Sequence, residues 1–307
     1  MLIVLFAPPG PIDAWLAALR TALPGDTIVG SDAGFDPAEV AVAVGGRLPS
    51  ESLHAFPNLR LIVSLLAGVD QLLASELPDV PIVRAGNPAG DAMMSEMALL
   101  HTLRHHREMP RLAEAQRSAV WDNRRPLRAS DRCVGVLGLG AIGADAAATL
   151  ARHGFQVMGW SRTPKSIPGV DCRHGADGFA AVLGASSIVA NLLALTPATE
   201  DILDAAAFAA MPAGAAVINL GRGQHVVDGD LLAALDSGHL AAATLDVFRT
   251  EPLPPDHPFW RHPQVTVTPH VSRALYPEDF APQVAAQVHR LKNGAPPLRA
   301  VDRARGY

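Results

Sequence analysis

The run Val134-Gly135-Val136-Leu137-Gly138-Leu139-Gly140-Ala141-Ile142-Gly143 decides the fold class of this chain. An apolar strand pattern leads into glycines spaced G-x-G-x-x-G, and a helical pattern follows over 144–153. In that context the first glycine permits a tight turn, the second lets the backbone approach a pyrophosphate, and the third lets the helix pack closely on the strand. The N-terminus of the helix adds amide donors for phosphate. We therefore predict a dinucleotide site, with a glycine-rich turn in an unrelated α/β protein as the alternative. Its residues are Gly138, Leu139, Gly140, Ala141, Ile142 and Gly143.

Strand and helix patterns alternate along the chain, which predicts an α/β fold with parallel sheets. Six buried strands, enough for a complete doubly wound sheet, are expected at 133–137, 156–160, 188–192, 216–220, 243–248 and 265–268. Strand patterns before residue 90 predict a second sheet, to which a final helix over 282–293 returns. A helix over 91–108, closing at Met109-Pro110, is expected to bridge the two parts.

The predicted architecture is therefore two doubly wound, Rossmann-like domains with a cleft between them. Residues 1–98 plus 277–307 form the expected substrate-binding domain, and residues 99–276 form the expected dinucleotide-binding domain.

Composition narrows the class of protein. Of the 307 residues 49% are hydrophobic and 18% charged, which excludes a disordered chain. The formal net charge of -5 disfavours binding to nucleic acid or to an anionic membrane. The two cysteines have no Cys-x-x-Cys spacing, which favours a reducing compartment and disfavours structural zinc. Glycine, proline or charge interrupts every run that approaches the ~20 apolar residues needed to span a bilayer. We expect a cytoplasmic protein without nucleic-acid or membrane partners.

The segment after the second strand of the nucleotide sheet predicts the choice of cofactor. An NAD site usually carries an acid there for the ribose hydroxyls. This chain instead has Ser161, Arg162, Thr163 and Lys165, with no acid among residues 160–165. The two cations suit the 2'-phosphate of NADP(H), which we predict as the preferred cofactor, with NAD(H) possible. Ordinary solvated loop charges are the alternative interpretation.

Three residues that follow strands of the second sheet predict a catalytic set. Arg222 lies between two glycines and can grip a planar carboxylate with its fork of donors. His270 can exchange a proton with a carbonyl or hydroxyl oxygen near neutral pH, and Glu251 can orient its ring and favour the imidazolium. Together they suit a 2-oxo or 2-hydroxy acid.

The spaced segments 138–143, 191–199, 219–223, 245–252 and 268–271 resemble the D-2-hydroxyacid dehydrogenase family, most closely its glyoxylate/hydroxypyruvate reductase group. The resemblance implies a homodimer with an interdomain cleft and catalytic roles for Arg222, Glu251 and His270. It implies further cofactor contacts at Leu192, Leu193, Thr199, Leu220, Gly221 and Asp246. A strand-end acid with a structural role is the alternative for Asp246. The resemblance also implies substrate contacts from Arg222, His270 and the backbone amides of Ala67, Gly68 and Val69. Leu66 departs from the family, which usually has glycine there.

We therefore predict NADPH-dependent reduction of a small 2-oxo acid. The alternative is an NAD(P)-binding sensor of the corepressor type on the same fold, whereas formate oxidation is disfavoured because Glu251 stands where a neutral amide is needed. No metal is expected. His101, His105 and His106 have helical spacing that could suit a metal, but neighbouring arginines favour a solvated or dimer-facing helix. His225 is expected at the surface or in a loop. For Trp121 the sequence leaves two roles open, packing and a pocket edge.

Overall fold

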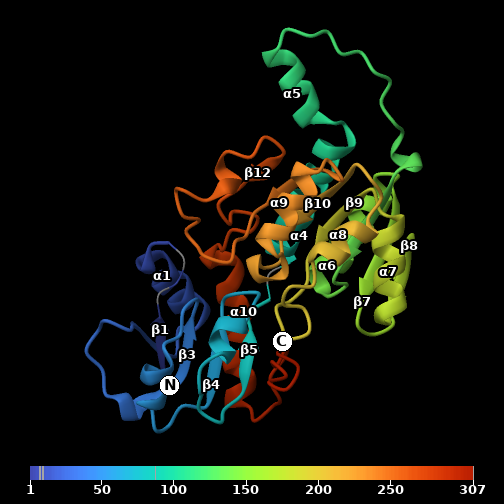
Figure 1. Cartoon of the computed structure of the whole chain (residues 1–307). Coiled ribbons are helices and arrows are strands. Elements are labelled where there is room, and N and C mark those ends of the chain that lie inside the picture. The colour runs from blue at the N-terminus through green and yellow to red at the C-terminus, as the bar shows by residue number, and fades with distance from the viewer. Residues whose placement is uncertain (7, 9, 87, 307) are drawn as a thin grey trace. The chain divides into compact units, whose positions relative to one another are not determined.

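The computed structural model describes residues 1–6, 8, 10–86 and 88–306, and it divides into two compact units (Figure 1). Unit 1 consists of Met1–Gly90 and Ala274–Tyr307, and unit 2 consists of Asp91–Arg273. The domain boundary expected at 98/99 falls inside the helix Pro88–His106, and the one expected at 276/277 falls at the start of the helix Pro277–Lys292.

Unit 1 is a parallel five-stranded sheet with strand order β2-β1-β3-β4-β5. Its strands are β1 (Leu2–Phe6), β2 (Thr27–Gly30), β3 (Val40–Gly45), β4 (Leu61–Ser64) and β5 (Ile82–Arg84). Its helices are α1 (Ile12–Ala22), α2 (Ser50–His54), α3 (Asp70–Leu73) and α10 (Pro277–Lys292). All five residues of β1 are buried because side chains cover both faces of the sheet, with Trp15 and Phe280 in contact on one face and Phe56 on the other.

The final helix returns to the first unit, where α10 packs against α1. The expected start at residue 282 was wrong, because α10 begins at Pro277 and contains Pro282. A proline at the first helical position costs no backbone hydrogen bond, and Glu278 and Asp279 in the first turn complement the helix dipole.

Unit 2 is a parallel seven-stranded sheet with strand order β12-β11-β10-β9-β6-β7-β8. Its strands are β6 (Cys133–Leu137), β7 (Gln156–Ser161), β8 (Val170–His174), β9 (Ile188–Asn191), β10 (Ala215–Asn219), β11 (Leu240–Leu245) and β12 (Val265–Val267). Its helices are α4 (Pro88–His106), which crosses from unit 1, α5 (Met109–Arg117), α6 (Ala141–Arg152), α7 (Gly175–Ala185), α8 (Ala205–Ala210) and α9 (Asp228–Asp236). The predicted α/β class with two parallel, Rossmann-like sheets is confirmed.

The expectation of six strands in the second sheet was wrong. Strand β8 is the edge strand of the sheet, and among the described residues β7 is the one strand that pairs with it. Its sequence, Val-Asp-Cys-Arg-His, is therefore mostly polar and carries no apolar signal.

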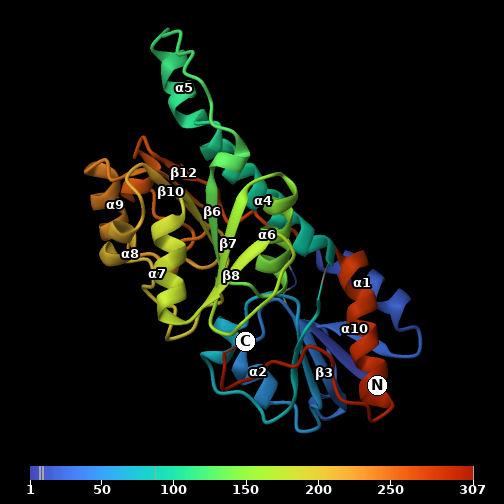
Figure 2. The same cartoon turned by 90° about the vertical axis from the view of Figure 1, so that its right-hand side faces the viewer.

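Pro110 does not end the bridging helix as expected. Helix α4 ends at His106, Glu108 adopts a left-handed conformation with φ of 50°, and Pro110 lies in the first turn of a new helix, α5. In both views α5 and the chain after it stand away from the sheet of unit 2 (Figures 1 and 2). Within the described residues, no helix combines the length and the apolar character that crossing a membrane requires.

Candidate active site

The glycine-rich turn joins β6 to α6 and leaves open space at one position. A Cβ on Gly138, whose φ is +96°, would lie 2.8 Å from the carbonyl oxygen of Leu192, and a Cβ on Gly143 would lie 1.7 Å from that of Gly138. A Cβ on Gly140 would meet nothing within 4 Å. The outer glycines are thus required by packing, while the backbone at Gly140 faces space that a pyrophosphate can approach.

The side chains of this turn divide between the core and the surface. Leu139 is buried against Gly159 in the core, so only its backbone can face a cofactor. Ala141 is exposed and Ile142 half-buried at the start of α6. The arrangement fits a dinucleotide bound by backbone amides.

The end of β7 presents positive charge. Ser161 is buried and its hydroxyl donates to the carbonyl of Thr163 over 2.7 Å, which stabilises the turn. Arg162, Thr163 and Lys165 are exposed beyond it. Cations at the position where an NAD site carries an acid suit a phosphate on the adenosine ribose.

The segment after β9 approaches the glycine-rich turn, because the Leu192 amide donates to the Leu137 carbonyl over 2.8 Å. Strands β6 and β9 are neighbours at which the strand order reverses, which is where ligands bind in doubly wound sheets. The Thr199 hydroxyl donates to Ala194 O over 2.8 Å, and so braces its own loop.

His270 and Glu251 form a contact pair at the ends of β12 and β11. His270 Nδ1 lies 2.7 Å from Glu251 Oε2, and Glu251 Oε1 accepts from the Phe248 amide over 2.9 Å. The His270 side chain is 52% exposed and that of Glu251 35%. Because Glu251 occupies Nδ1, Nε2 is the ring atom left for a substrate. His270 has a φ of 54°, a left-handed conformation that costs a non-glycine residue about 1–3 kcal/mol and is typical of functional sites.

Asp246 organises the loop that carries His270. It is 1% exposed, and its carboxylate accepts from the Thr268 hydroxyl over 2.6 Å and from the amides of Val271 and Ser272 over 3.0 and 3.1 Å. The His270 amide donates to the Asp246 carbonyl over 2.8 Å. These contacts match the structural alternative for this acid, and its predicted cofactor contact stays a prediction.

Arg222 follows β10, the strand beside β11. One guanidinium N–H donates to the Gly221 carbonyl over 2.8 Å. A Cβ on Gly223 would lie 1.9 Å from the carbonyl carbon of Phe248, so the Arg222 loop lies against the loop that carries Glu251. Leu220 and Gly221 are buried beneath it.

The segment that the resemblance expects to bind a carboxylate belongs to unit 1. Ala67 and Gly68 are half-buried and Val69 is buried, between β4 and α3. The Leu66 amide donates to the Ser64 hydroxyl over 3.2 Å. The substrate contacts of this segment stay predictions.

Three polar residues of unit 2 were not singled out from the sequence: Asn191, Asn219 and His225, all 0% exposed. His225 lies in the connection between β10 and α9, as the loop alternative expected, but it is buried and not at the surface. The two asparagines end the neighbouring strands β9 and β10, and the position of a polar residue at the end of an apolar strand is the signal that could have identified them.

The solvated interpretation of His101, His105 and His106 was also wrong, because they are 4, 7 and 6% exposed. Burial lowers the pKa of His105 to about 3, assisted by nearby positive charge, and its Nε2 lies 2.9 Å from Thr244 Oγ1. Burial also lowers the pKa values of His101 and His106. In the part of the chain that the structure describes, no group of three or more His, Cys, Asp or Glu side chains is arranged to hold a metal.

Comparisons with known proteins identify the family. Residues 99–272 match the domain described as D-isomer specific 2-hydroxyacid dehydrogenase, NAD binding domain. In an alignment 315 residues long, the chain is 40% identical to the glyoxylate/hydroxypyruvate reductase A of Serratia proteamaculans (strain 568), with 100% of both chains covered.

Two solved structures share the whole fold. A D-isomer specific 2-hydroxyacid dehydrogenase from Xanthobacter autotrophicus Py2, in complex with NADPH and MES, is 43% identical with a TM-score of 0.96, and the match covers 100% of this chain and 99% of that chain. The NADPH-dependent glyoxylate/hydroxypyruvate reductase of Sinorhizobium meliloti, in complex with NADP and sulfate, is 35% identical with a TM-score of 0.92 and 100% coverage of both. The resemblance found in the sequence is confirmed, and this chain belongs to the D-isomer specific 2-hydroxyacid dehydrogenase family.

Proposed function

We propose that this protein uses NADPH to reduce a small 2-oxo acid of the glyoxylate or hydroxypyruvate type to the 2-hydroxy acid. The observation that carries the proposal is the 2.7 Å contact between His270 Nδ1 and Glu251 Oε2 at the carboxyl edge of the sheet that bears the glycine-rich turn. A carboxylate-supported histidine is suited to proton transfer to a carbonyl oxygen. The names of the relatives from Serratia and Sinorhizobium support the substrate class and the cofactor.

In the proposed reaction, bound NADPH supplies a hydride to the keto carbon. His270 donates the Nε2 proton to the carbonyl oxygen, which becomes the hydroxyl of the product. Glu251 holds the ring through its contact with Nδ1, which leaves Nε2 to face the carbonyl oxygen. Arg222 binds the substrate carboxylate with its planar fork of donors. After the step the imidazole is neutral and takes a proton from water.

Turnover by the purified protein separates this proposal from the sensor alternative. With NADPH and a panel of 2-oxo acids, we expect catalytic consumption of NADPH with glyoxylate and hydroxypyruvate. Tight NADPH binding without turnover of any panel member would contradict the enzyme proposal and favour the sensor.

We propose that the chain acts as a homodimer in the cytosol. The support for a dimer is an arm, residues 107–128, that carries exposed apolar side chains. Val120 is 59% exposed, Trp121 92% and Leu127 51%. The arm also holds six arginines against three acids in a chain of net charge -5, so its charge complements the rest of a second copy. The support for the cytosol is that Cys133 and Cys172 are free.

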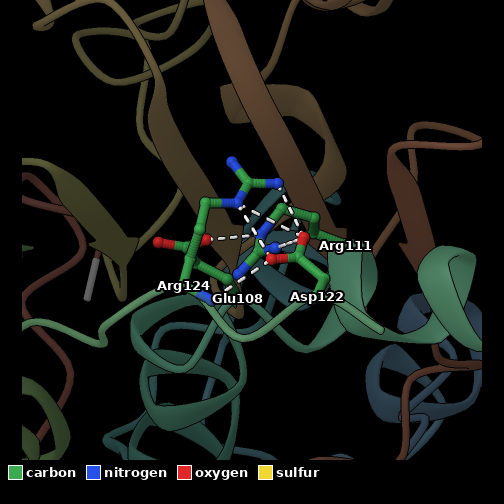
Figure 3. Close-up of polar contacts among 4 residues, drawn as sticks. All are labelled: Glu108, Arg111, Asp122 and Arg124. Atoms are coloured by element: carbon green, nitrogen blue, oxygen red, sulfur yellow. Dashed lines mark hydrogen bonds and ion pairs between the residues drawn. The ribbon is translucent and has the colours of Figure 1, made fainter. Parts of the chain in front are cut away.

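Ion pairs give the arm a defined conformation (Figure 3). Arg111 Nε contacts Glu108 Oε2 over 2.6 Å, and another nitrogen of the same guanidinium contacts Asp122. Arg124 contacts the same carboxylate oxygen of Asp122 over 2.8 Å. The contacts fix the segment that holds Trp121 relative to the start of α5, so a partner would meet a preorganised surface.

Replacing Trp121 by serine tests the arm. Buried tryptophans at interfaces typically contribute 2 kcal/mol or more, so we expect the dimer dissociation constant to rise by at least about thirtyfold. Sedimentation equilibrium measures it. Trp260→Ser, at a tryptophan that is 48% exposed, is the matched control and should leave association unchanged. A Trp121→Ser protein that associates like the wild type would remove the arm from the interface.

A further inference from the structure

We infer that Asn191, Asn219 and His225 form a buried polar set that positions Arg222 for substrate binding. The inference rests on the proposed role of Arg222 and adds three positioning residues to it. Asn191 and Asn219 are paired at the last positions of β9 and β10, and His225 ends the short 3-10 turn Gly223–His225 that follows Arg222. All three are 0% exposed.

Backbone groups fix the orientation of both asparagine amides. The Leu193 amide donates to Asn191 Oδ1 over 3.2 Å, so Asn191 Nδ2 faces Asn219 Oδ1 and His225 Nδ1, each at 2.9 Å. The Gly221 amide donates to Asn219 Oδ1 over 3.2 Å, so Asn219 Nδ2 faces the other way. Each amide can therefore be assigned from donors whose identity is certain.

The two polar groups of the Arg222 backbone are both held by this set. Its N–H donates to His225 Nδ1 over 3.1 Å, and its carbonyl accepts from Asn219 Nδ2 over 2.9 Å. Because Arg222 N–H and the Asn191 amide both donate to Nδ1, that nitrogen carries no proton and the ring proton is on Nε2. The Arg222 main chain is thereby fixed from both sides, which leaves the guanidinium to move only about its own side-chain bonds.

The set also joins two parts of the proposed site. Asn191 holds the Leu193 amide, in the segment expected to contact the cofactor, and through His225 it holds the residue expected to grip the substrate. Buried hydrogen-bond networks in which every member is oriented confer a single geometry. We therefore assign these three residues a positioning role, which requires no contact with the reacting atoms.

Two substitutions of His225 separate an acceptor role from a filling role. Asparagine can place Oδ1 where Nδ1 stands, whereas glutamine is closer to histidine in size but places its acceptor one bond further out. We expect His225→Gln to lower kcat/KM for glyoxylate by about tenfold, mainly through KM, because misplacing a substrate-binding group weakens substrate binding. His225→Asn should stay within about threefold of the wild type, and the NADPH dissociation constant should change by less than about twofold in both variants.

A double-mutant cycle tests whether the effect passes through Arg222. In an Arg222→Ala background, His225→Gln should cause no further loss of kcat/KM, because coupled residues are not additive. His105→Gln is the matched control, since His105 is also buried and makes a hydrogen bond in unit 2. It should lower the unfolding midpoint and leave kcat/KM unchanged.

The outcomes distinguish a failure of the positioning set from a failure of the proposed role of Arg222. If His225→Gln is as active as His225→Asn, or if its loss persists in full without Arg222, the positioning set is wrong while the role of Arg222 stands. If Arg222→Ala alone keeps wild-type kinetics, both the grip and the positioning set are overturned. Far-ultraviolet circular dichroism and urea unfolding verify that each variant is folded, and the Asn and Gln variants keep a polar side chain so that the comparison does not depend on an apolar replacement.

Discussion

Replacing His270 by alanine is expected to lower kcat for glyoxylate reduction by about 10² to 10⁴, the usual contribution of general acid-base catalysis. The side chain is half-exposed at the end of β12 and its Nδ1 is engaged by Glu251, so its removal deletes the proton donor without opening the core. Steady-state kinetics at saturating glyoxylate measures the effect. The NADPH dissociation constant, measured by fluorescence titration, should barely change.

Glu251→Gln is the companion variant. Glutamine can still accept from the Phe248 amide, so the loop geometry should survive, but it no longer supports a positive ring. We expect a loss smaller than that of His270→Ala. Wild-type turnover by His270→Ala would remove this histidine from the mechanism, whatever the effect at Glu251.

The second large effect concerns cofactor choice. Each charge-assisted bond from arginine or lysine to a phosphate contributes roughly 1.5–3 kcal/mol when well formed. Arg162 and Lys165 are exposed, which reduces that contribution through solvent screening. We expect the wild type to prefer NADPH over NADH on the order of 10² in kcat/KM, since about 1.4 kcal/mol is tenfold. In Arg162→Ala/Lys165→Ala the ratio should fall toward unity, mainly through weaker use of NADPH.

The matched control is Arg261→Ala, an exposed cation elsewhere in unit 2, which should leave the ratio unchanged at the same ionic strength. Substitution at Ser161 does not test cofactor choice cleanly. Its buried hydroxyl donates to the Thr163 carbonyl, and an aspartate there would present an acceptor to another acceptor. Equal use of NADH and NADPH by the wild type would show that the two cations are ordinary surface charges.

Local signals explain what the sequence predicted well. The glycine-rich turn is specified by a contiguous strand, turn and helix, and Glu251 and His270 each follow an apolar strand within a few residues. The carboxyl ends of parallel strands lie at one edge of the sheet. The order of the strands in the sequence was therefore enough to predict that Glu251 and His270 lie close together.

Features that depend on distant partners escaped prediction. Strand β8 is polar because it lies at a sheet edge, and α5 was hidden by a proline that usually marks a helix end. His225 looks like any loop histidine until β9 and β10 place Asn191 and Asn219 beside it. The charged neighbours of His101, His105 and His106 indicated a solvent-exposed helix, whereas the three histidine side chains are buried.

The most direct test of the account follows the hydride. Purified protein is mixed with glyoxylate and NADPH that carries deuterium at the transferred position of C4, and both the NADPH consumed and the label in the product are measured. We expect one glycolate for each NADPH oxidised, with one deuterium at C2. The proposed reductase activity is contradicted if NADPH binds but is not consumed with glyoxylate or any other 2-oxo acid. It is also contradicted if the product gains its C2 hydrogen from water.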